Sequence, residues 1–254
     1  PASPAPATST QNVAPTGSIT VQWARHLDEV RAAQKLRHDV FVGEMGARLP
    51  VVIEGHDIDL FDDYCEHLLV KDEGSGEVVG TYRVLTPAQA RRVGSTYSDT
   101  EFDLVRLRGV RSKMVELGRS CVHPEHRHGG VIMALWAGLG EYMQRYGFES
   151  MLGCASVSMG DGGHFAASLY RSFVDDGSLA PIEYHAFPRV PLPVDELNQN
   201  LEVDPPALVK GYLRLGARIC GAPAWDPDFN VADFLTLLRL SDINPRYARH
   251  FLRG

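Results

Sequence analysis

An acid among apolar neighbours and a glycine-rich turn lie close together near the middle of this chain. Glu116 and Arg119 belong to the mainly apolar run 112–123, which predicts a strand, and Gly129 and Gly130 follow in a turn. A carboxylate in such a run can remove a proton from an ammonium group and release a nucleophilic amine. A glycine turn before a helix exposes backbone N–H groups that bind anions. These residue types suit a reaction that combines proton removal with the binding of an anionic group.

Each part of this pattern also has a structural interpretation. Glycine before a helix is common in ordinary strand–helix turns, so the turn alone is a weak signal. Glu116 could be a buried acid whose only task is to pair with Arg119. Because an unpaired buried charge is costly, we expect these two side chains to be paired under either interpretation.

Four further charged residues could hold an amino-acid acceptor. Asp59 and Asp62 lie in the acidic segment 50–63 and are candidates for binding its ammonium group, although charge runs are usually solvated loops. Arg37 and Arg83 could bind its carboxylate through paired hydrogen bonds. The alternative for both arginines is a surface position or a structural ion pair.

No metal site is expected. His123, His126 and His128 have a spacing that could bind a metal, but turns often carry polar histidines. The four cysteines are far apart and form no CxxC pair, which indicates reduced, buried thiols rather than a disulfide framework or a zinc site.

The surrounding segments predict the elements that must position these residues. Apolar runs and alternating patterns predict strands at 19–24, 67–72, 77–85, 112–123, 148–158 and 231–243. Apolar residues at helical spacing predict helices at 27–47, 87–94, 131–147 and 162–174. Adjacent hairpin strands mixed with helices favour an α+β fold, with a mixed central β-sheet flanked by helices.

Composition narrows the class of protein. The 254 residues carry a formal net charge of −7, and no run approaches the ~20 apolar residues of a membrane span. A nucleic-acid partner is not expected, since it needs a basic face. Residues 1–18, rich in Pro, Ala, Ser and Thr, predict a flexible tail. Residues 19–254 predict a single domain whose C-terminal extension begins near residue 190. We expect a cytoplasmic protein with at most peripheral contact at the inner face of the membrane.

The glycine turn resembles motif A of the GNAT acyltransferases. That motif reads Arg or Gln, two residues, Gly, one residue, then Gly or Ala, and this chain has RHGGVI from Arg127 onward. The resemblance implies that Arg127, Gly129, Gly130 and Val131 cradle the donor's phosphate groups. The bulky Ile132 replaces the last small residue, which favours a phosphopantetheine arm on a carrier protein over coenzyme A.

Longer segments resemble the ornithine-lipid type of N-acyltransferase. They read LRHDVFVGEMGA, DLFDDYCEHLLV, VELGRSCVHPEHR and PALVKGYLRLGARICGAPAWDPDFNVADF, within roughly residues 21 to 240. The same frame is similar to the N-acylhomoserine lactone synthases. The positions that match the pattern of those synthases are Arg37, Phe41, Asp59, Asp62, Arg83, Glu116 and Arg119.

This resemblance implies a GNAT-fold N-acyltransferase. It would move a fatty or 3-hydroxyfatty acyl chain from an acyl carrier protein thioester to the α-amine of an amino acid such as ornithine, giving a lyso-aminolipid. Glu116 would be the base, and Tyr170 stands where many GNAT enzymes carry the tyrosine that protonates the leaving thiolate. No tightly bound cofactor is implied. The alternatives are an acyl-coenzyme A donor with another small amine, and a non-catalytic acyl-binding domain.

Two remaining groups have weaker interpretations. The basic run formed by Arg106, Arg108, Arg111 and Lys113 could steer an acidic carrier protein, or could be a solvated loop. A motif in the second half of the chain also matches the lipid-type enzymes. Its structural interpretations are a helix N-cap or a contact with a lid. Its residues are Lys210, Asp226, Asp228, Phe229 and Asp233.

Overall fold

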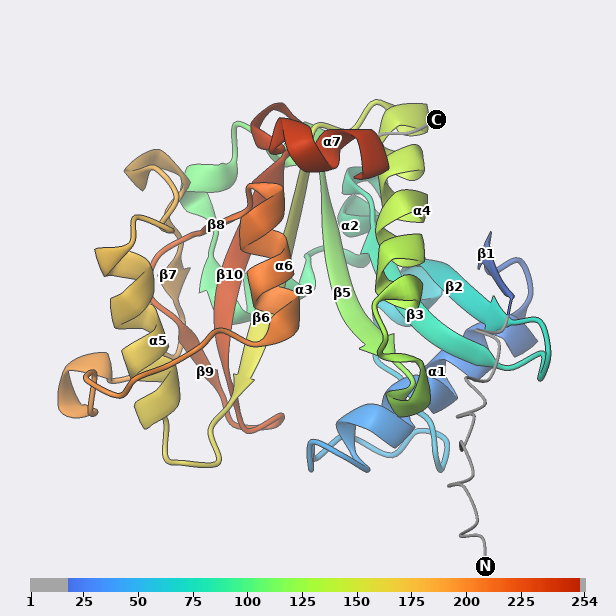
Figure 1. Cartoon of the computed structure of the whole chain (residues 1–254), viewed down its shortest axis with the longest axis horizontal. Helices are drawn as coiled ribbons and strands as arrows, with labels where there is room; N and C mark the ends of the chain where they lie inside the picture. The colour runs from blue at the N-terminus through green and yellow to red at the C-terminus, as the bar shows by residue number, and fades with distance from the viewer. Residues whose placement is uncertain (1–17, 252–254) are drawn as a thin grey trace, which may run out of the picture.

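A computed structural model of the chain describes residues 18–251 (Figure 1). The predicted tail lies outside the described residues apart from Ser18. The strands are β1 Ile19–Trp23, β2 Glu66–Asp72, β3 Val78–Leu85, β4 Phe102–Asp103, β5 Met114–Val122, β6 Ser150–Ser158, β7 Phe187–Pro188, β8 Arg218–Ile219, β9 Ala224–Asp226 and β10 Val231–Arg239. The α-helices are α1 Leu27–Phe41, α2 Pro87–Val93, α3 Tyr97–Glu101, α4 Gly130–Tyr146, α5 His164–Asp175, α6 Ala207–Leu215 and α7 Pro245–Phe251.

One large mixed sheet organises the domain. Its strand order is β1-β2-β3-β5-β6-β10-β8, and β9 pairs with β10. β5 and β6 run parallel, whereas their outer neighbours β3 and β10 pair with them antiparallel. In Figure 1 helices α4 and α6 lie in front of the sheet and α3 lies behind it. The predicted α+β fold with a mixed central sheet and flanking helices is confirmed.

Helix α4 anchors the front of the sheet because its apolar residues recur at helical spacing. Val131, Leu135, Leu139 and Met143 are buried in one cluster with strand residues such as Leu68. On the other side of the molecule, α1 buries residues that include Leu36 and Val40 in a second cluster. The helices thus fix the central strands from both directions.

The two parallel strands β5 and β6 stay paired over only a short length. Their register joins Met114, Val115 and Glu116 to Ser150, Met151 and Leu152, and no further pairs follow. At the last contact the backbones come very close, because a Cβ added to Gly153 would lie 2.5 Å from the Leu117 carbonyl oxygen. Beyond this point the strands diverge, and the sheet opens.

A bulge in β5 coincides with the opening. Its pairing with β3 shifts so that Gly118 faces Arg83 while Cys121 faces Thr81, and Arg119 has the left-handed φ of 52°. A bulge leaves an extra residue unpaired and redirects side chains. This irregularity therefore turns the Arg119 side chain, and interrupts the hydrogen-bond ladder, where the strands separate.

Within the described residues, no helix has both the length and the apolar character needed to cross a bilayer.

Candidate active site

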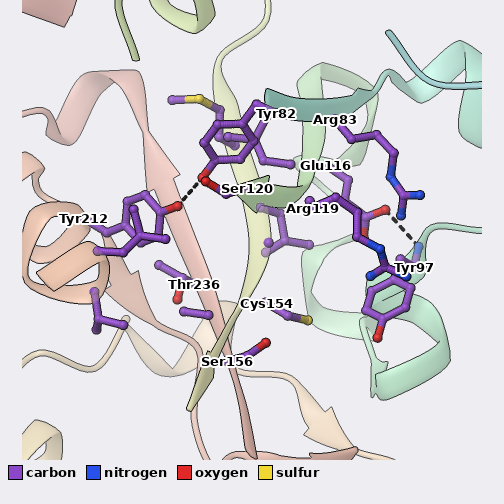
Figure 2. Close-up of a pocket in the computed structure, with 18 of the residues that line it drawn as sticks. Tyr82, Arg83, Tyr97, Glu116, Arg119, Ser120, Cys154, Ser156, Tyr212 and Thr236 are labelled. Carbon is purple, nitrogen blue, oxygen red and sulfur yellow. Dashed lines mark hydrogen bonds between the residues drawn. The ribbon is translucent and has the colours of Figure 1, made fainter. Parts of the chain in front are cut away.

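A cavity of about 270 Å³ occupies the opening between β5 and β6 (Figure 2). Polar residues line one part of it, including Tyr97, Glu116, Arg119, Ser156 and Asp226. Apolar residues from α4, α6 and the strands line another part, including Trp136, Leu139, Met151, Leu208 and Leu215. Figure 2 shows Glu116, Arg119 and Tyr97 at one side and Tyr212 at the other. The cavity therefore offers a polar site joined to an apolar slot.

Glu116 is held at the N-terminus of the short helix α3. Its carboxylate accepts hydrogen bonds from the backbone N–H groups of Tyr97 at 2.8 Å and Ser98 at 2.6 Å. Only 7% of Glu116 is exposed. Burial raises the pKa of Glu116 above the ordinary glutamate value, although these hydrogen bonds oppose the shift. A carboxylate with a raised pKa is a better proton acceptor, so the geometry supports a general base.

The predicted Glu116–Arg119 pair is wrong. Arg119 instead forms ion pairs with Asp57 and Asp59, each at 3.1 Å, and its guanidinium packs over the rings of Tyr97 and Phe229. The difference arises because Asp57 and Asp59, in the loop before β2, lie within reach of the Arg119 guanidinium and supply its partners. Backbone amides satisfy the buried carboxylate where the sequence suggested an arginine.

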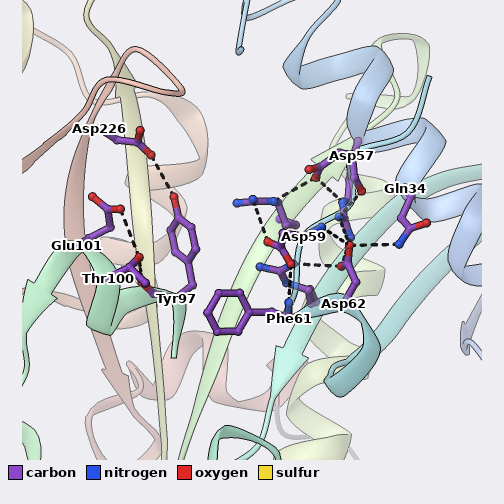
Figure 3. Close-up of polar contacts among 12 residues, drawn as sticks. Gln34, Asp57, Asp59, Phe61, Asp62, Tyr97, Thr100, Glu101 and Asp226 are labelled. Atoms are coloured by element: carbon purple, nitrogen blue, oxygen red, sulfur yellow. Dashed lines mark hydrogen bonds and ion pairs between the residues drawn. The ribbon is translucent and has the colours of Figure 1, made fainter. Parts of the chain in front are cut away.

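The predicted acceptor-binding charges form a buried ionic network (Figure 3). Arg37 pairs with Asp57 at 2.7 Å and with Asp62 at 2.8 Å, and Arg83 pairs with Asp59 at 2.6 Å. Burial alone would raise the pKa of Asp62, but the hydrogen bonds and charge of Arg37 hold it well below its usual range. These charges already have partners within the protein.

This network corrects the predicted role of two residues. Arg37 and Asp62 are buried and form an ion pair with each other, so neither presents a free charge to an acceptor. Their geometry supports a structural role that joins α1 to the loop before β2. Phe41 and Arg83 do line the cavity, whereas Asp59 lies next to it through its pair with Arg119. Substrate contacts by these three residues stay predictions.

A second group of acids lies beside the polar part of the cavity. The carboxylates of Glu101, Asp226 and Asp233 lie within 4.8 Å of one another. Asp226 accepts a hydrogen bond from the Tyr97 hydroxyl at 3.0 Å, and Asp233 accepts one from Ser156. Burial raises the pKa of Asp233 to about 7, and the charges of its acidic neighbours add to the shift.

No lysine, arginine or histidine of the described chain forms an ion pair with this acidic group. Lys210, which the sequence placed in the same motif, pairs with Asp204 instead. The sequence pointed to Asp226 and Asp233 without giving them a role, and it missed Glu101. Glu101 lies more than a hundred positions before the other two acids, so no local sequence pattern indicates that the three meet in the fold.

The predicted donor turn begins helix α4. Gly129 has a φ of 93°, which glycine adopts at little cost, and Gly130 is the first helical residue. Arg127 is exposed and forms two hydrogen bonds of 2.9 Å with Glu44. The Val131 side chain is buried against Gly80, so only its backbone is available to a ligand. Donor binding by this turn stays a prediction.

Tyr170 does not reach the cavity. It lies on α5, where it packs against a separate apolar cluster, so the predicted contact with the leaving thiolate is wrong for this geometry. The sequence predicted the helix, but it did not show which residues of the helix face the cavity. The tyrosines that line the cavity are Tyr82, Tyr97 and Tyr212, and the sequence signalled none of them.

The basic run is partly neutralised. Arg111 pairs with Asp99 and Lys113 pairs with Glu149, while the Arg106 guanidinium donates to the carbonyl of Ile182. Arg108 is exposed. Docking of a carrier protein on this run stays a prediction.

A mixed sheet that opens between two parallel strands, with a glycine turn leading into the next helix, is the architecture of the GNAT acyltransferases. Residues 36–137 match the family described as acetyltransferase (GNAT) domain. Within that class, the chain belongs to the L-ornithine N(alpha)-acyltransferase family. It is 37% identical to the enzyme of that name from Agrobacterium fabrum, over 92% of this chain and 85% of that protein.

Two further comparisons agree with this assignment. The L-ornithine N(alpha)-acyltransferase of Brucella abortus is 35% identical over 92% of this chain and 89% of its own length. The fold is similar to the solved structure of the CoA-dependent acyl-homoserine lactone synthase MesI, with a TM-score of 0.53 and 15% identity. That match covers 92% of this chain and 96% of the synthase. The predicted membership of the ornithine-lipid type is confirmed, and the predicted similarity to the N-acylhomoserine lactone synthases is confirmed for the fold.

Proposed function

We propose that this protein transfers a fatty or 3-hydroxyfatty acyl group from a thioester to the α-amine of ornithine, giving a lyso-aminolipid. The observation that carries the proposal is Glu116, a buried carboxylate with a raised pKa at the point where β5 and β6 separate. Membership of the L-ornithine N(alpha)-acyltransferase family supports both the reaction and the acceptor.

The reaction follows from the geometry of the opening. Glu116 takes a proton from the α-ammonium group, directly or through water, and the free amine attacks the thioester carbon. The new C–N bond gives a tetrahedral oxyanion, for which backbone N–H groups of the β5 bulge are suitable donors. Collapse breaks the C–S bond, and the thiolate takes a proton while the amide product loses one.

Ornithine carries a second ammonium group, and the acidic group formed by Glu101, Asp226 and Asp233 suits it. These carboxylates form no ion pair with a cationic residue of the described chain, so a ligand cation would offset their mutual repulsion. Tyr97 connects the two sites, because its backbone N–H binds Glu116 and its hydroxyl binds Asp226. This arrangement favours a cationic acceptor.

The donor is proposed to be an acylated carrier protein. Its acyl chain would occupy the apolar part of the cavity, between α4 and α6. Ile132 stands where GNAT motif A has a small residue, and Arg127 is engaged by Glu44, which weakens the case for a coenzyme A pyrophosphate. The amphiphilic product would bring peripheral contact with the membrane surface.

Purified protein offered ornithine with 3-hydroxypalmitoyl carrier protein, and separately with palmitoyl-coenzyme A, tests the proposal by mass spectrometry. N-acylornithine should form with the carrier protein donor, and Glu116→Gln should remove it. Glu141→Gln, at an exposed acid paired with Arg145 on α4, is the matched control and should keep full activity. Transfer only from coenzyme A would overturn the donor assignment. No consumption of either donor would favour a non-catalytic acyl-binding domain.

A further inference from the structure

Three hydroxyl groups gather in the cavity at a distance from Glu116 (Figure 2). Tyr82 comes from β3, Tyr212 from α6, and Ser120 from the bulge in β5. The hydroxyls of Tyr82 and Tyr212 hydrogen-bond to each other, and the Ser120 hydroxyl interacts with both. Tyr82 is 3% exposed. The cavity thus holds a compact polar site of three hydroxyls, which the proposed mechanism does not use.

The surroundings of this site are apolar. Leu139, Met151, Leu215 and Leu238 line the same part of the cavity. Polar groups placed in such a lining cost free energy unless their hydrogen-bonding capacity is used. Each hydroxyl can donate one hydrogen bond and accept two, so three hydroxyls that bond mainly to each other keep unused capacity.

The indole of Trp136 is a further polar group near this site. Trp136 lines the cavity, its ring centroid lies 5.8 Å from that of Tyr212, and its buried Nε1 has no hydrogen-bond partner. A buried donor without a partner is uncommon in a folded protein. Together the hydroxyls and the indole indicate a ligand oxygen in this otherwise apolar slot.

We propose that Tyr82, Tyr212 and Ser120 form a subsite that binds a hydroxyl group on the third carbon of the acyl chain. This inference rests on the proposed function, and it names residues that select the donor. Ser120 belongs to the bulge that we assign to the thioester oxyanion, so the three hydroxyls lie near the carbonyl end of the chain. A hydroxyl two carbons from the carbonyl is within their reach, whereas one far along the chain is not.

A direct part in proton transfer is the main alternative for these phenols. Burial raises the pKa of Tyr82 and of Tyr212 above that of a free phenol, although the hydrogen bonds of Tyr82 oppose its shift. An ordinary thiol is already a stronger acid than a phenol, so proton transfer from either tyrosine to the leaving thiolate is uphill. Neutral phenols that donate and accept hydrogen bonds suit an uncharged hydroxyl better.

The test compares two donors on one carrier protein, 3-hydroxyhexadecanoyl and hexadecanoyl. Wild-type protein should prefer the hydroxylated donor in kcat/KM. Tyr82→Phe and Tyr212→Phe should each lower that preference roughly 5- to 10-fold, the effect of losing one hydrogen bond to a neutral group. Tyr142→Phe is the matched control, because Tyr142 packs with Trp23 outside the cavity, and it should keep the preference.

Three outcomes would overturn the inference. Equal losses on both donors would mean that the phenols act on the thioester itself. An unchanged preference would place hydroxyl recognition elsewhere, and a wild-type protein without any preference would remove the need for it.

A binding assay separates this inference from the proposed function. Displacement of a fluorescent fatty acid by 3-hydroxyhexadecanoate and by hexadecanoate measures recognition without turnover, and melting curves show whether each variant is folded. If the protein transfers no acyl group but still prefers the hydroxylated acid through Tyr82 and Tyr212, only the proposed function fails. Equal displacement by the two acids in wild-type protein contradicts the subsite.

Discussion

Replacing Arg37 by methionine distinguishes a structural charge from an acceptor-binding charge. The Arg37 guanidinium donates four hydrogen bonds, two to Asp57 and two to the carboxylate of Asp62. All three side chains are at most 2% exposed. Removing one partner of a buried ion pair typically costs about 3 to 5 kcal/mol, since the remaining charges stay buried without compensation. We expect Arg37→Met to lower the free energy of unfolding by about that amount.

The pH dependence of this loss gives a second check. The folded pKa of Asp62 lies below its unfolded value, so its contribution to stability is present above the unfolded pKa of about 3.9 and is lost as the pH falls through the folded pKa. Arg37 is a main cause of the lowered pKa. The difference in stability between wild type and Arg37→Met should therefore be largest near neutral pH and shrink below about pH 4.

Urea unfolding at pH 7 and across the acid range measures both effects. Arg145→Met is the matched control, because Arg145 pairs with Glu141 on an exposed helix face, where such a pair contributes about 0.5 kcal/mol or less. If Arg37→Met folds with near wild-type stability but needs much more ornithine, the structural assignment is wrong and the sequence-based prediction of carboxylate binding is right.

Three other perturbations follow from the site. Asp226→Asn should lower kcat/KM for ornithine roughly tenfold more than for norvaline, which has the same chain without the second amine, because Asp226 lines the cavity and its loss removes a charge-assisted contact; equal losses would contradict cation recognition. In a pH profile of kcat/KM, activity should rise as Glu116 loses its proton, with a midpoint above the ordinary glutamate pKa of about 4.3. A midpoint at or below that value would exclude Glu116 as the base. Gly153→Ala should destabilise the fold by about 1 to 3 kcal/mol in urea unfolding, since its Cβ would meet the Leu117 carbonyl; unchanged stability would show that the strands can separate there without cost.

The strand–turn–helix unit around Glu116 could be predicted because its signals are local. Apolar runs marked the strands that became β5 and β6, and the glycines marked the start of α4. The hairpin of β2 and β3 was equally clear from the polar turn between two apolar runs. The mixed sheet followed from the order of these elements.

The partners of the charged residues could not be predicted, since they depend on contacts far apart in the sequence. Glu116 binds the start of α3, a short helix about twenty residues earlier that has little apolar periodicity. Arg37 finds Asp57 and Asp62 across a loop of irregular structure. For Tyr170 the predicted helix is correct, but the predicted contact with the leaving thiolate is wrong, because the side chain does not line the cavity.

The residues that shape the cavity were hidden for the same reason. Tyr82 and Tyr212 are 130 positions apart and meet only because α6 packs over the opened sheet. Glu101 joins Asp226 and Asp233 through the return of β9 and β10 beside β6. Neither set has a spacing that a sequence pattern could detect.

A single-turnover reaction shows whether Glu116 activates the α-amine of ornithine. Acylated carrier protein would be mixed with excess enzyme and ornithine, and fragmentation of the product would show which nitrogen carries the acyl group. We expect acylation of the α-nitrogen by wild-type protein and its loss in Glu116→Gln. Acylation of the side-chain nitrogen, or undiminished transfer by Glu116→Gln, would contradict the assigned base and the way the acceptor is held.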